Sequence, residues 1–439
     1  MAKVLKSQPL NKSVAIIGGG LAGLAAAAKL AEQGIPTTLF EATPQLGGRA
    51  RRVIWKNTHL DNGQHILLGA YHHTLQLLRL IKVDEKSALL RMPLTLHMSK
   101  FLRLKAHPYL PAPLHLLFGL LTAKGLNWLE KWAAIRFFIQ LKLQGFHIAQ
   151  DRPLASFLAL NQQPQKLVQL LWEPLCLAAL NTPLHQASTQ VFLNVLRDSF
   201  NKKRSDSDLL LPQIDLSALF ADAIAAYTQE KGVQIKLNQA IKKIEPVQDG
   251  FKLINEAKGE FHFKHVIIAT SPFRMSELGL ALKLPKPNFS YQPIYTVYLQ
   301  YPPDTKLPRV MTGLCNTLSQ WVFDRGQLCG QAGLVAVIIS AEGAHQNLTQ
   351  QALAEHVAAE MKQSFTDLPE PIWHKVIAEK RATFACTPNL RRPQMQTQWP
   401  NLYLAGDYVA GDYPATIEGA IRSGIACAKQ IAEQTQPKT

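Results

Sequence analysis

Short apolar runs and one longer mixed stretch alternate at the start of the chain. Val14–Ile17 is fully apolar and ends in glycines, and Thr37–Phe40 is a second short run that ends at a glutamate. Between them, residues 21–33 are rich in Ala and Leu, and Gly34 follows directly. Short apolar runs favour buried strands, and the longer stretch favours a helix that stops at the glycine. The pattern predicts a strand–helix–strand unit, followed by a loop-rich region at 42–70.

The pattern changes after residue 75. Residues 75–200 are mostly helical in pattern and are interrupted by prolines. Later elements follow from apolar runs, helical spacing and turn residues. We predict helices at 218–232, 350–365 and 417–433, strands at 233–237, 240–244, 266–270, 296–301, 334–340 and 402–405, and a hairpin turn at Asp249 and Gly250.

Elements typical of a nucleotide-binding fold therefore occur at both ends of the chain and in its middle. We expect one dinucleotide-binding domain assembled from residues 1–75, 216–272 and 391–439. Residues 76–215, mainly helical, and 273–390, a sheet with a helix, form the material inserted between these parts. The predicted fold class is α/β: a Rossmann-type domain with an inserted α+β substrate domain.

The charge of the chain limits the classes of partner that it is expected to bind. The formal net charge is +16 and the sequence pI is about 9.6. Such an excess of Lys and Arg favours an anionic membrane surface or nucleic acid, although it also serves solubility. No zinc-ligand spacing, RNA-binding aromatic strand or dense basic run is visible, so we expect no nucleic-acid partner.

The segment 100–145 concentrates the basic charge. It holds seven Lys or Arg residues and a single acid, Glu130, interleaved with Leu, Trp and Phe. This composition suits a helix that lies in the headgroup layer of a membrane. An ordinary core helix with a solvated basic face explains the pattern equally well.

Targeting and cysteine usage point to the cytoplasm. Residues 1–12 are polar and short, unlike a signal peptide, and no apolar stretch is long enough to span a membrane. We expect a cytoplasmic protein, peripheral on the inner face of the cell membrane. The cysteines show no close pairing, which predicts free thiols and no metal site; they are Cys176, Cys315, Cys329, Cys386 and Cys427.

A glycine motif joins the first predicted strand to the first helix. Gly18, Gly20 and Gly23 give the spacing GxGxxG: the first permits a tight turn, the second lets a pyrophosphate approach the backbone, and the third lets helix and strand pack closely. Glu41 ends the second strand, where a carboxylate accepts from ribose hydroxyls. These residues predict a dinucleotide but do not separate NAD from FAD.

Two further segments point to FAD. Residues 47–50, GGRA, resemble the second cofactor motif of the amine oxidase and phytoene desaturase superfamily, and residues 402–428 resemble its C-terminal flavin segment. The resemblance implies a GR2-like flavoprotein with non-covalent FAD. Motifs and resemblance together assign these residues to the cofactor: Gly18, Gly20, Leu21, Ala22, Gly23, Glu41, Ala42, Gly48, Arg49, Gln64, His65, Ile241, Gly406, Asp407 and Ile417.

A narrower resemblance concerns the substrate. Residues 61–71, DNGQHILLGAY, resemble the carotenoid desaturase branch, whereas WEPLCLAALNTP at 172–183 and DLLLP at 208–212 resemble the hydroxysqualene dehydroxylases, squalene-associated FAD enzymes of bacterial hopanoid synthesis. The resemblance covers essentially the whole chain. It implies reductive removal of the allylic hydroxyl of hydroxysqualene, a long acyclic isoprenoid, with upstream prenyl synthases of the squalene pathway as further partners.

Such a reaction needs a hydride and a proton donor for the departing oxygen. The candidate donors are His65, Tyr71 and Glu173, and the sequence does not choose among them. Two other functions remain open. One is a carotenoid or other isoprenoid desaturase, which uses the flavin in the oxidative direction. The other is a non-catalytic isoprenoid-binding protein, like the Rab GDP-dissociation inhibitors, for which intact FAD motifs would be unnecessary.

Overall fold

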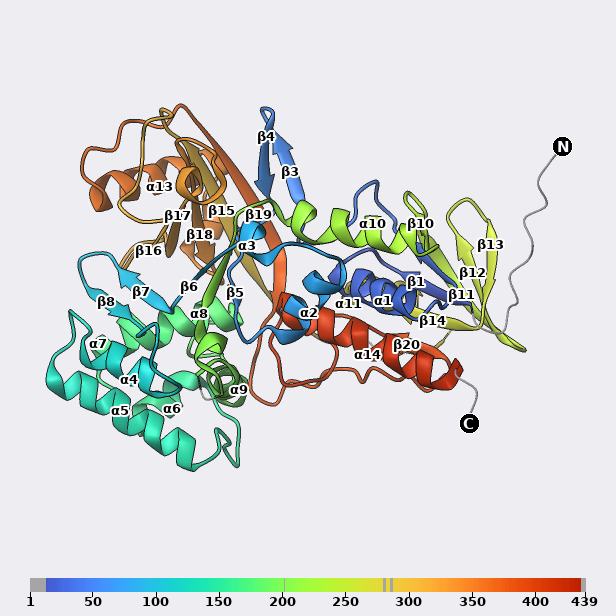
Figure 1. Cartoon of the computed structure of the whole chain (residues 1–439), viewed down its shortest axis with the longest axis horizontal. Helices are drawn as coiled ribbons and strands as arrows, with labels where there is room; N and C mark the ends of the chain where they lie inside the picture. The colour runs from blue at the N-terminus through green and yellow to red at the C-terminus, as the bar shows by residue number, and fades with distance from the viewer. Residues whose placement is uncertain (1–12, 201, 279–281, 285–286, 436–439) are drawn as a thin grey trace.

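The computed structural model describes residues 13–200, 202–278, 282–284 and 287–435, so the polar segment 1–12 lies outside the described residues. Two lobes lie side by side along the long axis (Figure 1). One is built on a parallel sheet near both chain ends. The other holds a large mixed sheet and a layer of helices. Strands β15 and β19 reach from the second lobe toward the first.

The first lobe is built around a parallel sheet of five strands. Its five-stranded parallel sheet has the order β10 (Gln234–Lys236), β2 (Thr37–Phe40), β1 (Val14–Ile17), β14 (His265–Ile268) and β20 (Leu402–Leu404). The strands β1, β2, β14 and β20 are fully buried, which explains why their sequences are continuous apolar or Thr-rich runs. The predicted first unit is thus confirmed, with β1 at the centre of the sheet.

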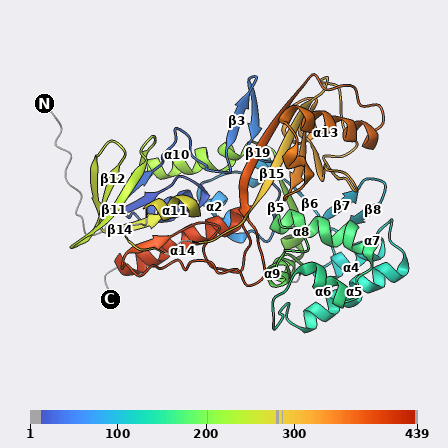
Figure 2. The ribbon, with the colours of Figure 1, turned by 180° about the vertical axis from the view of Figure 1, so that it is seen from behind.

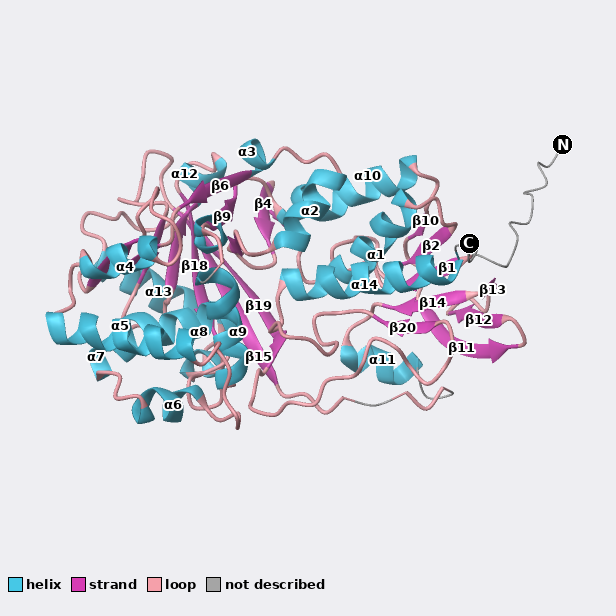
Figure 3. Cartoon of the chain, turned by 60° about the horizontal axis from the view of Figure 1, so that its bottom comes forward, coloured by secondary structure: helices cyan, strands magenta, loops and turns pink. Residues whose placement is uncertain are grey.

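Helices cover this sheet. They are α1 (Leu21–Glu32), α2 (His72–Leu80), α10 (Asp222–Glu230), α11 (Pro272–Leu278) and α14 (Ile417–Thr435), with a π-helical turn at Ser217–Ala221 before α10. The short helix α3 (Glu85–Ala88) packs against β6 (Leu89–Met92) instead. α14 packs directly along α1, as Figure 3 shows. Gly424 makes this possible, because a Cβ there would lie 2.0 Å from the carbonyl oxygen of Ala22.

A small antiparallel sheet extends the first lobe. It comprises β11 (Ile241–Val247), β12 (Gly250–Asn255) and β13 (Glu260–Phe263). The predicted hairpin at Asp249 and Gly250 joins the first two strands, with Gly250 at a positive φ of 145°.

The second lobe is built on a seven-stranded sheet. Its order is β19 (Trp373–Phe384), β15 (Tyr291–Gln300), β18 (Leu334–Ser340), β17 (Trp321–Asp324), β16 (Met311–Gly313), β7 (Thr95–Met98) and β8 (Leu102–Lys105), and all pairs but β16–β7 are antiparallel. Helices α12 (Arg325–Cys329) and α13 (Gln350–Ser364) pack on this sheet. The sheet borders the helical layer seen from behind in Figure 2.

The helical layer comes from the middle of the inserted segment. It comprises α4 (Leu114–Leu121), α5 (Trp128–Leu143), α6 (Leu154–Leu160), α7 (Gln165–Leu167), α8 (Glu173–Leu180) and α9 (Thr189–Phe200), with a π-helical turn at Val168–Trp172 and a 3₁₀ turn at Arg204–Ser207. The hydroxysqualene-type segment 172–183 starts in the π turn. A short sheet of β5 (Leu67–Leu68), β9 (Leu209–Pro212) and β6 (Leu89–Met92) joins this layer to the first lobe.

Three local predictions need correction. The loop-rich region 42–70 contains a hairpin of β3 (Arg52–Trp55) and β4 (Thr58–Asp61), whose turn residues Lys56 and Asn57 both adopt positive φ. The mostly helical region 75–200 contains strands β6, β7 and β8. In β8 the sequence LRLK alternates buried Leu with exposed Arg and Lys, which is a strand period, so the proposed interfacial helix does not start at residue 100. Strand β19 was not predicted.

Several properties bear on function. No helix in the described ranges is long and apolar enough to cross a lipid bilayer. All five cysteines are free thiols, and three of them are buried. Within the same ranges no group of three or more His, Cys, Asp or Glu residues is arranged to hold a metal ion.

Candidate functional site

One cavity of about 1140 Å³ connects the two lobes. It begins at the carboxyl ends of the parallel strands, where Gly18 follows β1, Glu41 follows β2 and Ala269 follows β14. Open parallel sheets bind ligands outside the carboxyl ends of their strands. From there the cavity continues between the seven-stranded sheet and the helical layer. It is larger than most single-ligand pockets, which suits a dinucleotide together with a second molecule.

The glycine motif lies at the first end of this cavity. Gly18 has a φ of 113°, and a Cβ there would lie 2.6 Å from the carbonyl oxygen of Ala269. Around Gly20 a Cβ would meet nothing within 4 Å, so this backbone is open to a ligand. Gly23 does not line the cavity; a Cβ there would lie 2.0 Å from the carbonyl oxygen of Gly18. The three glycines thus occupy the turn, the approach and the packing positions that their spacing predicts.

The start of α1 makes this end favourable for an anion. Gly20 is the N-cap and offers no side-chain hydrogen bond to the helix. The first amide groups of a helix lack intrahelical partners and carry partial positive charge. A pyrophosphate would supply the acceptors that α1 lacks.

Glu41 holds the loop around this end. Its Oε2 accepts from the Gly19 amide at 2.7 Å, and its Oε1 accepts from the amide and hydroxyl of Thr43 at 2.9 and 2.8 Å. Glu41 and Ala42 line the cavity, as does Ile241 at the start of β11. The carboxylate is therefore fixed in place before any ribose is bound, with lone pairs left to accept from hydroxyl groups.

The GGR segment meets the C-terminal segment across the cavity. Arg49 Nη2 donates to Asp407 Oδ2 at 2.7 Å. Burial alone would lower the pKa of Arg49, but the Asp407 carboxylate, together with Glu379 and Tyr291, outweighs this effect and raises the pKa, so the guanidinium stays charged. Gly48, Arg49, Gly406 and Asp407 all line the cavity. Gly406 donates its amide to Ser423 Oγ on α14 at 2.7 Å.

The remaining C-terminal residues form the turn before α14. Ala415, Thr416 and Ile417 line the cavity, and α14 begins at Ile417. Glu418 does not line it. This buried carboxylate instead accepts from the amides of His73 and Thr74 and from both their side chains, at 2.7–3.1 Å. It joins the start of α14 to the start of α2.

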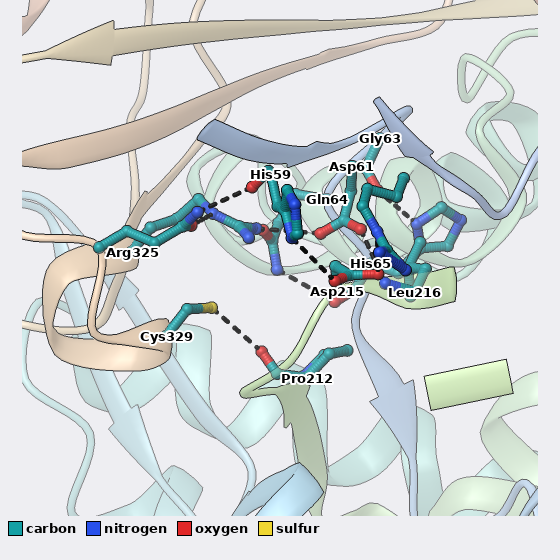
Figure 4. Close-up of polar contacts among 12 residues, drawn as sticks. His59, Asp61, Gly63, Gln64, His65, Pro212, Asp215, Leu216, Arg325 and Cys329 are labelled. Atoms are coloured by element: carbon teal, nitrogen blue, oxygen red, sulfur yellow. Dashed lines mark hydrogen bonds and ion pairs between the residues drawn. The ribbon is translucent and has the colours of Figure 1, made fainter. Parts of the chain in front are cut away.

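The segment 61–65 begins at the end of β4, and Figure 4 shows four of its residues close to Arg325 and Asp215. Gln64 and His65 line the cavity, and Asp61 is buried behind them. His65 Nδ1 lies 2.6 Å from the carbonyl oxygen of Gly63. Since a carbonyl only accepts, Nδ1 carries the hydrogen, and Nε2 of the neutral ring is an acceptor. Burial lowers the pKa of His65, which favours this neutral form.

The three candidate proton donors differ in position. Tyr71 lines the cavity at the start of α2, and burial raises its pKa, so its hydroxyl keeps its proton. His65 also lines the cavity but presents an acceptor. Glu173, the first residue of α8, is half-buried and is not among the residues that line the cavity, although burial raises its pKa. The structure therefore places two of the three, His65 and Tyr71, on the wall of the cavity.

The far half of the cavity is apolar. Segment 175–181 contributes the end of α8, and Asn181 clamps it: Nδ2 donates to Thr383 Oγ1 at 3.0 Å, and Oδ1 accepts from the Ala341 amide at 2.7 Å. The other apolar lining residues come from β7, β9, α9 and the mixed sheet. They include Leu94, Leu96, Phe192, Leu196, Leu209, Met311, Trp321 and Phe323.

Sequence reasoning missed a charged stretch on β19 and one further arginine at this site. Glu379, Lys380 and Arg381 of β19 line the cavity, and Glu379 Oε2 accepts from Asn62 Nδ2 at 3.3 Å. Arg392 donates to the carbonyl oxygens of Asp407 and Tyr413 at 3.0 and 2.7 Å and so holds the C-terminal loop. Three consecutive charged residues mark this part of β19, but the strand WHKVIAEKRATF also contains His374, Lys375 and Thr383, so no apolar run identifies it. Nothing in the local sequence marks Arg392.

Known proteins resemble this chain over nearly its full length. The sequence profile of the family described as flavin containing amine oxidoreductase matches residues 21–432. Hydroxysqualene dehydroxylases from Rhodopseudomonas palustris and Zymomonas mobilis are 27% and 28% identical; the matches cover 96% and 94% of this chain and 99% and 97% of those proteins. A 15-cis-phytoene desaturase of Solanum lycopersicum is 25% identical, with 97% of this chain and 78% of that protein covered.

Solved structures share the fold. Cyclohexylamine oxidase from Brevibacterium oxydans superimposes with a TM-score of 0.69 at 16% identity, over 97% of this chain and 99% of that chain. At this identity the likeness concerns the fold alone. It agrees with a dinucleotide-binding lobe joined to a second lobe across a shared cavity.

Proposed function

This chain belongs to the flavin-containing amine oxidoreductase family, and from that premise we propose that it removes the hydroxyl group of hydroxysqualene reductively to give squalene. It is an FAD-dependent oxidoreductase. The single observation that carries the proposal is the cavity: glycine-motif backbone and Glu41 line one end, and an apolar channel bordered by segment 175–181 forms the other. A dinucleotide fits the first half, and a long hydrocarbon fits the second.

The residues present suit the cofactor. Gly20 leaves space for a pyrophosphate at the start of α1, Glu41 holds acceptors for ribose hydroxyls, and Arg49 brings a positive charge opposite Asp407. Bound reduced FAD would supply a hydride. The substrate carbon gains this hydride while its bond to oxygen breaks, and the oxygen leaves as water once it receives a proton. The protein must orient the hydroxyl, exclude water and provide that proton.

Among the three candidates, Tyr71 is the proton donor that the geometry favours. Its hydroxyl keeps its proton, and its ring lines the cavity. His65 is neutral with an acceptor nitrogen, so it suits a hydrogen-bond acceptor for the substrate. Glu173 does not line the cavity. The apolar channel fits the allylic, charge-developing carbon, because it keeps competing nucleophiles away.

FAD-dependent desaturation of a carotenoid or another isoprenoid is the second candidate function. The resemblance to a phytoene desaturase over 97% of the chain supports it, and such enzymes also need an apolar channel beside FAD. The lower identity and the segments 172–183 and 208–212 favour the dehydroxylase. A non-catalytic isoprenoid-binding protein is the weakest alternative, since the ordered FAD residues would then have no use.

Peripheral membrane attachment is part of the proposal, and the surface of α4 and α5 supports it. Trp128 and Leu129 are 72% and 80% exposed, and Trp132 is 62% exposed. The opposite side of α5 is also apolar, with buried residues such as Phe137 and Leu141. A helix that is apolar on both its covered and its uncovered side requires a second apolar contact. In Figure 2, α5 lies at the outer edge of the helical layer.

The charge around α5 suits an anionic membrane. Glu130, the only acid between residues 100 and 145, is 8% exposed, because it forms a capping box with Asn127. Its amide donates to Asn127 Oδ1 at 2.9 Å, and its Oε2 accepts from the Asn127 amide at 2.8 Å. The Lys and Arg side chains of this segment therefore have no exposed acid beside them in the same segment. Attachment at the inner face of the cell membrane, and contact there with the prenyl synthases that supply the substrate, complete the proposal.

The deciding experiment is anaerobic incubation of the protein with hydroxysqualene and chemically reduced FAD, followed by mass analysis. We expect squalene, formed with one equivalent of reduced flavin oxidised. Parallel incubation with a phytoene-like polyene and oxidised FAD tests the alternative. New double bonds in the polyene, with no squalene in the first reaction, would establish the desaturase instead.

A further inference from the structure

A buried arginine holds the segment 61–65 from behind. Arg325, the first residue of α12, is 2% exposed. Its Nη1 donates to Asp61 Oδ2 at 3.1 Å and to Gln64 Oε1 at 2.7 Å, and its Nε donates to Gln331 Oε1 at 2.6 Å. Figure 4 shows Arg325 reaching toward Asp61 and Gln64. The contact joins the mixed sheet to the loop that borders the cavity.

Asp61 is fixed by other elements as well. Its Oδ1 accepts from the Leu216 amide at 2.8 Å, and its backbone amide and carbonyl both contact the Tyr298 hydroxyl, at 3.1 and 2.9 Å. Segments around residues 61, 216, 298 and 325 thus meet at one buried ion pair. Such a pair contributes little net stability but imposes one geometry on its neighbours.

The pair dictates which way the Gln64 amide points. A guanidinium has only donors, so the Gln64 oxygen must face Arg325, and the Nε2 group must face away from it. The Gln64 Nε2 group lies 3.5 Å from the carbonyl oxygen of His65, which is the limit of a hydrogen bond. Gln64 lines the cavity, so a donor group is available there.

The next residue offers the opposite polarity. His65 Nδ1 is engaged with the Gly63 carbonyl at 2.6 Å, which leaves Nε2 of the neutral ring as an acceptor. A donor and an acceptor on consecutive cavity-lining residues match an alcohol, whose oxygen accepts one hydrogen bond and whose hydrogen donates another. A hydrocarbon can satisfy neither group.

We infer that Gln64 and His65 form the subsite for the substrate's hydroxyl group, and that Arg325 is a positioning residue that orients the Gln64 donor toward it. The inference deepens the proposed function, on which its substrate rests. It also gives a role to the buried ion pair of Arg325 and Asp61 behind the cavity wall. A second acceptor could compete for the same donor, namely an oxygen of the bound flavin.

Binding to the oxidised holoprotein tests the subsite without turnover. The dissociation constants of hydroxysqualene and squalene are measured by flavin absorbance changes in the wild type and in Gln64→Glu, Gln64→Leu, Arg325→Met and Arg325→Lys. The carboxylate of Gln64→Glu still accepts from Arg325 but donates nothing. We expect the wild type to prefer the alcohol by about tenfold, and Gln64→Glu, Gln64→Leu and Arg325→Met to lose most of that preference. Arg325→Lys, which keeps a donor, should restore part of it.

FAD affinity shows whether the Gln64 donor serves the substrate's hydroxyl oxygen or an oxygen of the flavin. If Gln64 serves the substrate, both Gln64 variants retain FAD as the wild type does. A tenfold loss of FAD affinity with an unchanged preference for the alcohol would overturn the inference and assign Gln64 to the flavin. Arg79→Met, at an exposed ion pair with Glu85, is the control for removing an arginine. Absence of squalene formation by the wild type would contradict the proposed reaction, whereas the binding preference reports on the subsite alone.

Discussion

Arg49 and Asp407 form an ion pair of 2.7 Å although 358 residues separate them along the chain. The pair closes the cavity wall between the GGR segment and the C-terminal segment. Arg49 also donates to the Ala382 carbonyl at the end of β19. The cofactor end of the site is therefore assembled from three segments that only the complete fold brings together.

The first prediction concerns this pair. Arg49→Met and Asp407→Asn should each weaken FAD binding by about tenfold to a hundredfold, because each leaves the other group without its charged partner beside the cofactor. The double variant should lose less than the sum of the two free-energy changes, since the second substitution removes a contact already lost. FAD fluorescence titration of the apoprotein gives all four affinities. Strict additivity would show that the two residues act on FAD independently.

Glu41 provides a second prediction about the cofactor. Glu41→Ala should weaken FAD binding by about 1.5–3 kcal/mol, because it removes charge-assisted hydrogen bonds to ribose and frees the Gly19 amide. Glu32→Ala, an exposed carboxylate on α1 paired with Lys29, is the matched control and should bind normally. Denaturation of the wild type should release all flavin, and flavin found on the precipitated chain would contradict non-covalent binding.

Within the cofactor end of the site, the first strand–helix–strand unit was predictable because its signals are local. Gly18, Gly20 and Glu41 act through backbone conformation and position within one strand–helix–strand unit. By contrast, Arg325 acts on a loop that lies 261–264 residues away in the sequence. Arg392 holds carbonyl groups only 15 and 21 residues further on, at Asp407 and Tyr413, but its neighbours show no pattern that marks it. Glu173 shows that a recognisable segment does not identify which of its side chains reaches the site. It belongs to a distinctive segment, yet helix periodicity alone could not tell that Leu175, and not Glu173, lines the cavity.

The strands of the fold also divide into those that a local sequence pattern marks and those that no local pattern marks. Strands β1 and β2 were located to the residue, since both are buried on two faces and read as continuous runs. Strand β19 was missed because it mixes exposed, half-buried and buried positions along twelve residues. Its charged stretch borders the cavity instead of the core, so neither a two-residue alternation nor an apolar run marks it.

The third prediction concerns membrane attachment. The wild type should bind anionic vesicles, and binding should weaken as salt screens the Lys and Arg charges. Trp128→Ser combined with Trp132→Ser should reduce binding at every salt concentration, because both exposed rings are lost. Ile372→Gln, at a 65% exposed position between α13 and β19, is the control. Equal binding to neutral vesicles would remove the electrostatic part of the proposal.

Glu418 gives a prediction about stability and pH. Burial alone would raise its pKa, but the hydrogen bonds from His73 and Thr74 outweigh this and hold the pKa below its ordinary value. Its carboxylate therefore stabilises the fold fully above the ordinary carboxyl pKa of about 4.5, and this contribution is lost as the pH falls toward the folded-state pKa. Glu418→Gln should cost about 2–4 kcal/mol at neutral pH.

The pH dependence distinguishes this role from simple packing. As the pH falls from about 4.5 toward the folded-state pKa of Glu418, denaturant unfolding of Glu418→Gln should show a shallower loss of stability than the wild type, since the titrating group is gone. Glu32→Gln should match the wild type throughout. Parallel pH profiles for wild type and Glu418→Gln would mean that the carboxyl titrates alike in the folded and unfolded chains.

The last prediction separates the candidate proton donors. Tyr71→Phe should lower the rate of squalene formation by about 10²–10⁴, the usual cost of losing a general acid, with FAD still bound. Glu173→Gln should keep most of its activity, because Glu173 does not line the cavity. His65→Leu should raise KM more than it lowers kcat, since an acceptor for the bound hydroxyl is lost. The wild-type rate should fall at pH values below the lowered pKa of His65, where protonation removes the same acceptor. A reverse order, with Glu173→Gln inactive and Tyr71→Phe active, would place the proton source in α8 and require the substrate to reach beyond the cavity wall.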